Sequence, residues 1–205
     1  VTEVCRRLTD VGELRRARIH PFNRLLALAV YRSGKSVRGS LSWDPIASVS
    51  DALEEAFYLS FSTVQPTGQR TMICIDVSHS MSASLMGSPV QVNEGAAAMA
   101  MVTARLEENY SIMAFDRGLR ELPITAKSAL ADVLKHTKDI NGGGTDCALP
   151  MLYAIDKKLQ VDVFQVYTDN ETYAGRMHPV AALQAYRKAS GIPAKLIVAG
   201  MTSTG

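Results

Sequence analysis

The stretch Thr71-Met72-Ile73-Cys74-Ile75-Asp76-Val77-Ser78-His79-Ser80-Met81 decides the fold of this chain. Its first five residues are mostly apolar and include no Gly or Pro, which predicts a buried parallel strand that ends at Asp76. The Asp-x-Ser-x-Ser pattern then lies on the loop at the carboxyl end of the strand, where open α/β sheets bind ligands. One carboxylate and two hydroxyls are hard oxygen donors that suit Mg²⁺. By residue usage alone the pattern arises in roughly one chain in twenty of this length, so it needs support from other elements.

Strands and helices alternate after this stretch. Ser88 and Pro89 are expected to cap and begin a long helix that runs to about residue 106, and His178-Pro179 begins a helix that Gly191 closes. The other expected elements are strands at 110–115, 119–124, 162–168 and 195–200, and helices at 127–138 and 147–157. This alternation predicts an α/β fold with a doubly wound, mostly parallel sheet, in which 119–124 is an edge strand.

Residues 1–66 are expected to be helical. Pro21 begins a helix whose apolar residues recur on one face until Gly34 ends it, and Asp44 and Pro45 are placed to cap and begin a second helix. The Gly-Lys-Ser at 34–36 is not a phosphate-binding Walker loop, because the positions before it belong to a helix. Helices packed in this way resemble part of a helical-repeat array. The turn-rich segment 64–70 then separates a helical domain, 1–66, from an α/β domain, 67–205.

The composition narrows the class of protein. With 205 residues and 47% hydrophobic residues, the chain can build a sizeable core, and no apolar run has the length of a transmembrane helix. The amino-terminal residues lack the pattern of a signal peptide, and three widely spaced cysteines favour neither a disulfide framework nor a structural zinc site. A cytoplasmic protein without membrane contact is expected. The start without Met and the end directly after an apolar strand indicate a fragment that is truncated at its carboxyl end.

The net charge of +2 conceals an asymmetry between the two parts. Residues 1–40 contain nine Lys or Arg and three Asp or Glu, which is +6, so the remainder carries −4. A basic segment beside an acidic one is typical of a nucleic-acid surface attached to a cation-binding module. On charge alone, solvated helix faces explain the pattern equally well.

Three loops are expected to converge at the carboxyl edge of the sheet. They supply five oxygen donors: Asp76, Ser78, Ser80, Thr145 and Asp169. This set resembles the metal ion-dependent adhesion site of the von Willebrand factor A-type fold, which is Rossmann-like. The resemblance implies that Ser78, Ser80 and Thr145 bind Mg²⁺ (or Mn²⁺) through their hydroxyls, with Asp76 and Asp169 close by. An ion with so few carboxylate ligands keeps positive charge and an open position for an acidic group of a partner.

A second resemblance extends along nearly the whole chain. Its motifs are Ala17–Phe22, Val37–Gly39, Gln65–Gly68, Gly143–Met151, Thr168–Thr172 and Ile192–Val198. They are similar to the Ro autoantigen family of Y-RNA-binding proteins. The resemblance implies a ring of HEAT-like helical repeats, of which residues 1–66 are the closing part, joined to a von Willebrand A-type domain. It also implies binding of small noncoding Y RNA and of misfolded RNA.

Several residues keep two interpretations. The best candidates for RNA phosphate contacts are Arg15, Arg16, Arg18, His20, Lys35 and Arg38, each of which also fits an ordinary surface position. Tyr31 is a candidate stacking ring, whereas Trp43 is expected to be a packing anchor. His79 is expected to face solvent or support the site, and Cys147 is expected to be a packed thiol, although a position near a helix start can activate it. Asp146 is expected to cap a helix or to act beside the site, and Asn170 and Glu171 border the site.

An enzyme is the alternative to a binding protein. Asp76 can be imagined as the nucleophile of a Mg²⁺-dependent hydrolase or phosphotransferase. Phosphatases of that kind place a second acid two residues later, where this chain has Ser78, and no general acid or base is apparent. A non-enzymatic function is therefore expected.

Overall fold

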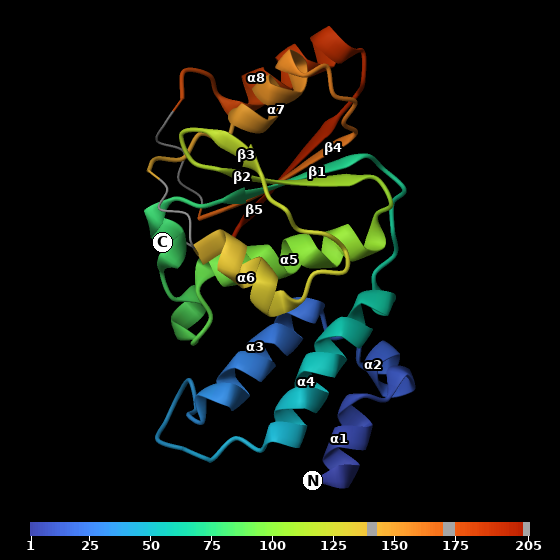
Figure 1. The fold of residues 1–205 in the computed structure, drawn as a ribbon, viewed down its shortest axis with the longest axis vertical. Coiled ribbons are helices and arrows are strands. Elements are labelled where there is room, and N and C mark those ends of the chain that lie inside the picture. Colours follow the sequence, from blue (N-terminus) through green and yellow to red (C-terminus); the bar gives the residue numbers. More distant parts are fainter. Residues whose placement is uncertain (139–142, 170–174, 203–205) are drawn as a thin grey trace. The chain divides into compact units, whose positions relative to one another are not determined.

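The computed structural model describes residues 1–138, 143–169 and 175–202, and these form two compact units (Figure 1). The first unit comprises residues 1–65 together with Ser84–Gln91, and the second comprises 66–83 and the described residues from Val92 onward. Ser84–Gln91 thus groups with the first unit, although the expected boundary places it in the second domain. Each unit has its own core and is described separately below.

The first unit is helical. Its elements are α1 (Thr2–Leu8), α2 (Val11–Ala17), α3 (Pro21–Ser33), α4 (Ala47–Leu59) and the 3₁₀ turn η1 (Ser60–Thr63). The predicted bounds of α3 are confirmed, since Pro21 is its first residue and Gly34 ends it in the left-handed region at φ 66°. A side chain at Gly34 would place its Cβ 2.6 Å from the Trp43 carbonyl oxygen, so this C-cap accepts only glycine.

The prediction that Asp44 and Pro45 begin the next helix is wrong. Helix α4 begins at Ala47, and its N-cap residue Ile46 makes no side-chain cap. Tyr31 organises this connection instead: its hydroxyl accepts a hydrogen bond from the Ile46 N–H at 3.1 Å, and its carbonyl accepts one from Trp43 Nε1 at 2.9 Å. The two rings also stack, with centroids 6.2 Å apart. Tyr31 is therefore engaged in packing, and Trp43 is the packing anchor that the sequence analysis predicts.

The second unit contains the predicted mostly parallel sheet. Its strands are β1 (Thr71–Asp76), β2 (Tyr110–Phe115), β3 (Leu119–Glu121), β4 (Val163–Thr168) and β5 (Lys195–Gly200). They lie in the order β3-β2-β1-β4-β5, and only the edge strand β3 is antiparallel to its neighbour. All six residues of β1 are buried, as its apolar run predicts. Because β1 and β4 are parallel and pair from Thr71 with Val163 to Ile75 with Tyr167, the loops after Asp76 and Thr168 leave the sheet side by side.

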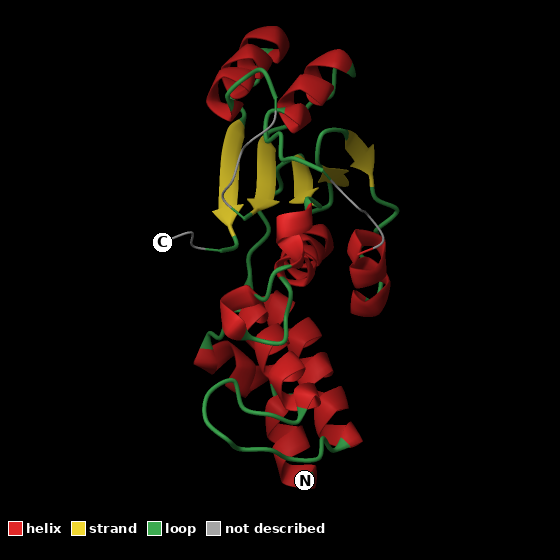
Figure 2. Cartoon of the chain, turned by 90° about the vertical axis from the view of Figure 1, so that its left-hand side faces the viewer, coloured by secondary structure: helices red, strands yellow, loops and turns green. Residues whose placement is uncertain are grey.

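Helices cover both faces of this sheet (Figure 2). On one face lie α7 (Leu149–Asp156) and α8 (Pro179–Ser190), and on the other lie α5 (Val92–Leu106) and α6 (Leu130–Lys138) (Figure 1). Met72 and Cys74 of β1 belong to the core cluster that includes Met151 of α7 and Tyr186 of α8. The intervening residues of β1 point to the opposite face. The α/β doubly wound fold class is confirmed.

The predicted helix start at Ser88 and Pro89 is wrong, because α5 begins four residues later than Ser88, at Val92. Ser84 and Gln91 instead form an antiparallel bridge, and the Leu85 N–H donates to the Val90 carbonyl at 2.8 Å. The Ser88 hydroxyl accepts from the Val90 N–H and so stabilises a turn of this small hairpin. Two short 3₁₀ turns, η2 (His79–Ser82) and η3 (Leu85–Gly87), complete the connection from β1 to α5.

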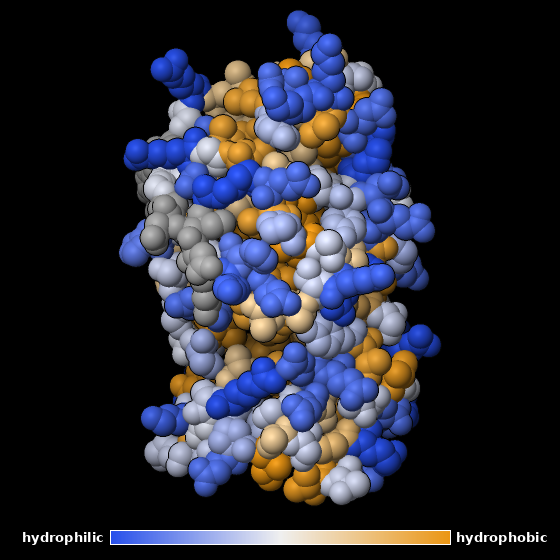
Figure 3. Space-filling view, viewed as in Figure 1, coloured by the Kyte–Doolittle hydropathy of each residue, from blue (hydrophilic) through white to orange (hydrophobic). Residues whose placement is uncertain are grey.

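Several large apolar side chains remain exposed among polar ones, as the surface view shows (Figure 3). Leu41 is 74% exposed in the helical unit, and Ile197 and Val198 of the edge strand β5 are each 49% exposed. Within the described residues, no helix is both long and apolar enough to cross a bilayer. No disulfide joins Cys5, Cys74 and Cys147 in the described part of the chain.

Candidate metal centre and candidate RNA-binding cavity

Asp76 is the centre of a hydrogen-bonded cluster at the carboxyl end of β1. Its side chain is fully buried. One carboxylate oxygen, Oδ1, accepts a hydrogen bond from the Ser78 N–H at 2.8 Å. The other, Oδ2, accepts from the hydroxyls of Thr145 at 3.2 Å and Thr168 at 2.7 Å. Three segments that are distant in the sequence therefore meet at this one carboxylate.

The two serines of the motif lie beside it. The Oγ atoms of Ser78 and Ser80 are 3.1 Å apart, at the start of η2. Ser78 is buried, whereas Ser80 and the intervening His79 are exposed. The cluster thus has a buried side at Asp76 and an accessible side at Ser80. His79 faces solvent, which is the first of its two predicted positions.

Asp169 completes the set of five predicted residues. It follows β4 directly and is 6% exposed, and its backbone carbonyl accepts a hydrogen bond from the Thr202 hydroxyl at 3.1 Å. Its carboxylate oxygen Oδ1 is buried and has no hydrogen-bond partner among the described residues. A buried acceptor without a partner is costly, more so when it is charged. This oxygen is therefore placed to receive a cation or a donor.

The electrostatics of the cluster also favour a cation. Burial is the largest influence on Asp76 and raises the pKa of its carboxyl group, and the nearby Asp169 carboxylate acts in the same direction. The hydrogen bonds from Ser78 and Thr168 oppose this and lower the pKa. Two acidic groups in a region of low dielectric repel each other, and a bound divalent cation would remove that repulsion.

The donor chemistry of the cluster fits Mg²⁺ or Mn²⁺. Two carboxylates and three hydroxyls are hard oxygen donors, and such donors match these ions better than softer metals. In the described part of the chain, no three His, Cys, Asp or Glu side chains come together to form an acid- or histidine-rich metal site. The predicted border residues Asn170 and Glu171, like Asn141 and Gly142 of the Gly-rich loop, lie outside the described residues.

Thr168 has a role in this cluster that its sequence position did not predict, and Asp146 shapes a turn instead of acting as the predicted N-cap. Thr168 donates the shortest of the three hydrogen bonds to Asp76, and the only signal for it was its place immediately before Asp169. Asp146 accepts from the Ala148 N–H at 3.0 Å, while its own N–H donates to the Asp116 carbonyl at 3.0 Å. Asp146 therefore shapes the turn before α7, whose N-cap residue is Ala148 and not Asp146. A Cβ at Gly175 would lie 2.4 Å from the Asp146 carboxyl carbon, so only glycine fits beside it.

Cys147 is 3% exposed and belongs to the same core cluster as Cys74. Burial strongly raises the pKa of the Cys74 thiol. The packing interpretation of these cysteines agrees with their surroundings, since a reactive thiol needs access to solvent.

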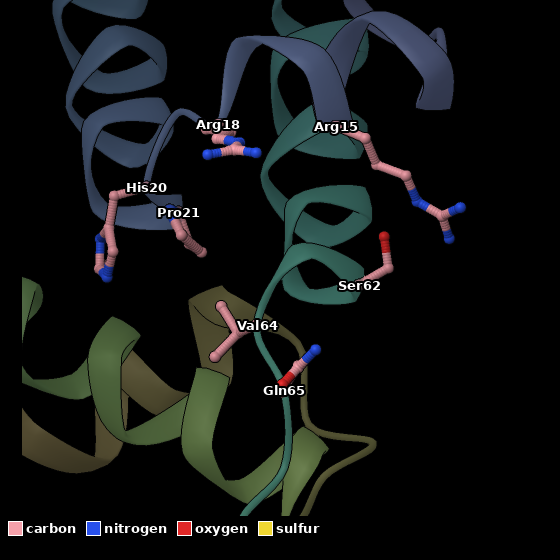
Figure 4. A pocket seen from close by; sticks show the side chains of 7 residues that line it. All are labelled: Arg15, Arg18, His20, Pro21, Ser62, Val64 and Gln65. Atoms are coloured by element: carbon pink, nitrogen blue, oxygen red, sulfur yellow. The ribbon is translucent and has the colours of Figure 1, made fainter.

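Three of the six predicted RNA-binding residues line one cavity in the helical unit. The cavity has a volume of about 460 Å³, and its lining includes Arg15, Arg18 and His20 together with Pro21, Val64 and Gln65 (Figure 4). The Arg18 guanidinium lies over the open space between the turn before α3 and Val64, and Arg15 lies on the far side of α4 from His20 (Figure 4). Among the residues that the structure describes, no acidic one lines the cavity. Within the described residues, neither arginine has a carboxylate within ion-pair distance.

The other three candidates lie elsewhere. Arg16 forms an ion pair with Glu13 at 2.6 Å on the exposed surface of α2 and does not line the cavity. Lys35 and Arg38 belong to the loop between α3 and α4 and do not line the cavity. Arg24, which was not a candidate, is 8% exposed, and its Nε and Nη2 atoms have no hydrogen-bond partner among the described residues. Burial lowers the pKa of this guanidinium.

The second unit is a mostly parallel sheet with helices on both faces, and Asp-x-Ser-x-Ser stands at the end of its central strand. A Thr and an Asp lie on the adjoining loops. Together these features define a von Willebrand factor A-type domain. The sequence model of the Ro60 vWA domain matches residues 70–205. The chain belongs to the Ro60 vWA domain family, so the predicted resemblance to the Ro family is confirmed.

Relatives of known sequence and structure extend this comparison over both units. The protein named RNA-binding protein RO60 from Caenorhabditis elegans is 44% identical to this chain over 98% of its length. The protein of the same name from Deinococcus radiodurans is 45% identical over 100% of its length. The crystal structure of the Deinococcus radiodurans RO (RSR) protein matches all of it with a TM-score of 0.90 and 43% identity. The chain spans 31% and 39% of the length of the two relatives and 42% of the crystallised chain. The HEAT-like character of residues 1–66 stays a prediction.

Proposed function

We propose that this chain is part of an RNA-binding ribonucleoprotein component, with RNA bound by the helical unit and a divalent cation bound by the α/β unit. The RNA is small noncoding Y-type RNA or misfolded RNA, and the protein acts in the cytoplasm. The observation that carries the proposal is the cavity that Arg15, Arg18 and His20 line, with no acidic residue among its described lining residues. The name of the relatives, RNA-binding protein RO60, also supports the proposal that this chain contributes to RNA binding.

The cation would be held by the oxygen cluster at the sheet edge. Ser78, Ser80 and Thr145 would bind Mg²⁺ or Mn²⁺ through their hydroxyls, with Asp76 and Asp169 close by. When bound, the ion supplies positive charge that attracts an acidic group of a partner. The exposure of Ser80 and the unpartnered Asp169 Oδ1 support this assignment.

The enzymatic alternative has less support. A nucleophilic aspartate needs a free carboxylate oxygen that faces the substrate. Asp76 is fully buried, and both of its oxygens accept hydrogen bonds from Ser78, Thr145 and Thr168. We therefore propose a binding function without catalysis. Metal-dependent turnover of generic phosphate esters that is lost in Asp76→Ala would overturn this.

The metal site is tested by thermal unfolding with and without Mg²⁺ or Mn²⁺. A cation at ten times its dissociation constant stabilises the native state by about 1.4 kcal/mol, which raises the unfolding midpoint by a few degrees. Asp169→Ala should abolish the increase, because it removes the unpartnered carboxylate. Asp132→Ala, which changes an exposed aspartate on α6, should keep it. An unchanged wild-type midpoint at millimolar concentrations of both metals would refute the site.

The RNA assignment is tested by the salt dependence of affinity. Fluorescence anisotropy with a single-stranded RNA should give a binding constant that falls as salt rises, because phosphate contacts release counterions. Replacing both Arg15 and Arg18 by Ala should reduce the slope of log affinity against log salt by about 1.4. Arg16→Ala is the matched control, since Arg16 is already paired with Glu13. A wild-type chain without measurable RNA affinity would refute the proposal.

A further inference from the structure

The turn between β2 and β3 lies at the same edge of the sheet as the candidate metal centre (Figure 1). Strand β2 runs parallel to β1, and the Phe115 carbonyl at its end accepts a hydrogen bond from the Val77 N–H at 3.0 Å. The Asp116 carbonyl accepts one from the Asp146 N–H, also at 3.0 Å. The start of this turn is therefore bonded both to the loop after β1 and to the loop that carries Thr145.

Arg117 is the residue at the tip of this turn. Asp116 fixes the turn, because its N–H donates to the Gly118 carbonyl at 3.0 Å and its Oδ1 accepts from the Gly118 N–H at 2.8 Å. The Arg117 side chain lies beside Gly143, where an added Cβ would be 3.6 Å from the arginine Nε and 3.9 Å from its Cζ. Gly143 is two residues before Thr145, which places the guanidinium on the order of 10 Å from the oxygen donors of the centre.

The charge of Arg117 is not balanced by a neighbouring carboxylate. Its side chain is exposed, and no acidic group of the described residues lies within ion-pair distance of it. The adjacent Asp116 carboxylate lies 3.5 Å from Arg120 instead. A cation beside a cation site weakens metal binding, because like charges repel each other, but it attracts an anion that binds to the metal. This arginine is therefore better placed to bind a ligand of the ion than to support the ion itself.

The net charge of the second unit favours a protein over a nucleic acid as the source of that anion. The charge of −4 that follows residue 40 comes from residues 41–65, which contain four acids and no Lys or Arg. Residues 66–205 therefore carry no net charge. A nucleic acid is held by an extended basic surface that contacts several phosphates. A single exposed arginine beside a metal centre fits a compact acidic group on a protein.

We propose that Arg117 is a second anion-binding point beside the ion, and that it recognises an extended protein segment with two acidic side chains two residues apart. One carboxylate would bind the ion, and the other would accept two parallel hydrogen bonds from the guanidinium. In an extended segment, residues two apart point the same way at a spacing of about 7 Å, and long acidic side chains widen the reach to on the order of 10 Å. This inference rests on the proposed metal site and narrows its partner from any acidic group to a pair.

The first test measures metal and ligand in one experiment. Bound Mn²⁺ raises the relaxation rate of water protons, and a carboxylate that replaces a water on the ion lowers it again. The probes are three pentapeptides with blocked ends: Gly-Glu-Ser-Glu-Gly, Gly-Glu-Ser-Gln-Gly and Gly-Gln-Ser-Gln-Gly. The two-acid peptide should bind the Mn²⁺-loaded protein roughly fivefold more tightly than the one-acid peptide, and the peptide without acids should not bind. A preference of no more than about twofold, which two equivalent acids give by statistics alone, would overturn the proposal.

Arg117→Ala separates ligand recognition from a structural role. The preference for the two-acid peptide should fall to about twofold or less, while Mn²⁺ affinity should stay equal or rise by up to about twofold at low salt, because a repelling charge is removed. The unfolding midpoint without metal should not change, since the side chain is exposed. A variant that loses affinity for both Mn²⁺ and the peptides would show a structural role and overturn the proposal.

Lys127→Ala is the matched control for net charge. It also removes one exposed positive charge, but next to Ala126, whose N–H donates to the hydroxyl of Tyr110, the first residue of β2. Lys127 thus lies near the amino-terminal end of that strand, whereas the metal centre lies at the carboxyl end. The variant should keep the wild-type preference. An equal loss of preference in Lys127→Ala and Arg117→Ala would assign the effect to overall charge and overturn the role of Arg117.

The outcomes also distinguish this inference from the proposed function. If Mn²⁺ gives no relaxation increase beyond that of the free ion, the metal site fails, and this inference fails with it. If Mn²⁺ binds but the two-acid preference is absent, the metal site stands and Arg117 takes no part in it. A single-stranded RNA that displaces the two-acid peptide from the wild type, and binds Arg117→Ala less well, would show that the anion is a phosphate and overturn the assignment to a protein.

Discussion

Asp76 shows how a buried carboxylate can be retained in an α/β core. Its burial is unfavourable for the charge, and the Asp169 carboxylate adds repulsion. Hydrogen bonds from the Ser78 N–H and from the Thr145 and Thr168 hydroxyls offset part of this cost. Asp169 has no such compensation at Oδ1 from any residue that the structure describes. The cluster is therefore arranged with more negative charge than its own donors neutralise, which is the condition for binding a cation.

Thr168→Val is the sharpest residue-scale change. Valine has nearly the shape of threonine but no hydroxyl, so Asp76 Oδ2 keeps only the longer hydrogen bond from Thr145. The free energy of unfolding should fall by roughly 1–3 kcal/mol, the usual cost of removing a donor from a buried charged acceptor. Urea unfolding of the metal-free protein measures this.

Thr168→Ser is the matched control, because it keeps the hydroxyl and loses only a methyl group. It should be more stable than Thr168→Val. If Thr168→Val is as stable as the wild type, the hydrogen bond does not hold Asp76 in place.

At the scale of elements, one ion pair joins the amino-terminal ends of β1 and β4. Arg70 Nη2 lies 2.6 Å from Asp162 Oδ1, and Arg70 Nε donates to Asp162 Oδ2 at 2.7 Å. The backbone N–H groups of Asp162 and Val163 in turn donate to the Arg70 carbonyl. The hydrogen bond from Arg70 lowers the pKa of Asp162 to about 2. This ion pair thus holds β1 and β4 together at their amino-terminal ends, at the edge of the sheet opposite Asp76.

This pair predicts a pH dependence of stability. The pKa of Asp162 is lower in the folded state than its ordinary value near 3.8, so the ionised form stabilises the fold above about pH 4. That contribution is lost as pH falls from about 4 through 2. Because the side chains of Arg70 and Asp162 are 40% and 22% exposed, we expect only ~1–2 kcal/mol.

Asp162→Asn tests it in chemical unfolding experiments between pH 7 and pH 2.5. The variant should be less stable than the wild type at pH 7, and the difference should shrink towards pH 2.5. A difference that stays constant over this range would contradict the pKa assignment.

Elements differed in how well their sequence predicted them. The strand 71–76 and the helix from Pro21 to Gly34 are determined locally, by an apolar run and by a Pro and Gly at the two ends. Ser88-Pro89 has the same local signal for a helix start, yet it lies in a hairpin. There the pairing of Leu85 with Val90 outweighs the capping preference. Asp44-Pro45 fails similarly, because Tyr31 ties down the chain before α4.

At the scale of the whole molecule, the chain first passes from one unit to the other between Gln65 and Pro66. The residues that follow are not a free linker. Glu107, 8% exposed just after α5, accepts hydrogen bonds from the N–H groups of Thr67 and Gly68 and from the Thr67 hydroxyl, at 2.8–2.9 Å. A buried carboxylate thus fixes the segment at which the second unit begins.

Glu107→Gln should loosen this segment. The amide oxygen can replace one carboxylate oxygen, but the amide NH₂ would face another N–H donor, so the hydrogen bonds cannot all form. The free energy of unfolding of the second unit should fall by roughly 1–3 kcal/mol, and limited proteolysis between residues 65 and 70 should become faster. Glu108→Gln, at the exposed neighbouring residue, is the control. Equal cleavage rates in all three proteins would contradict the anchoring role.

Local patterns by themselves determined the alternation of strands and helices, the mostly parallel sheet and the five oxygen donors, because periodicity and strand-end position are properties of neighbouring residues. They also found Arg15, Arg18 and His20 as basic candidates. Only the tertiary structure decided which of these residues line the same cavity, that Arg16 is paired with Glu13 and that Tyr31 is engaged in packing. It also decided that Thr168 donates to Asp76 and that the Arg24 guanidinium is buried. Those facts depend on contacts between segments far apart in the chain, and on which polar groups burial leaves without a partner, neither of which a local pattern contains.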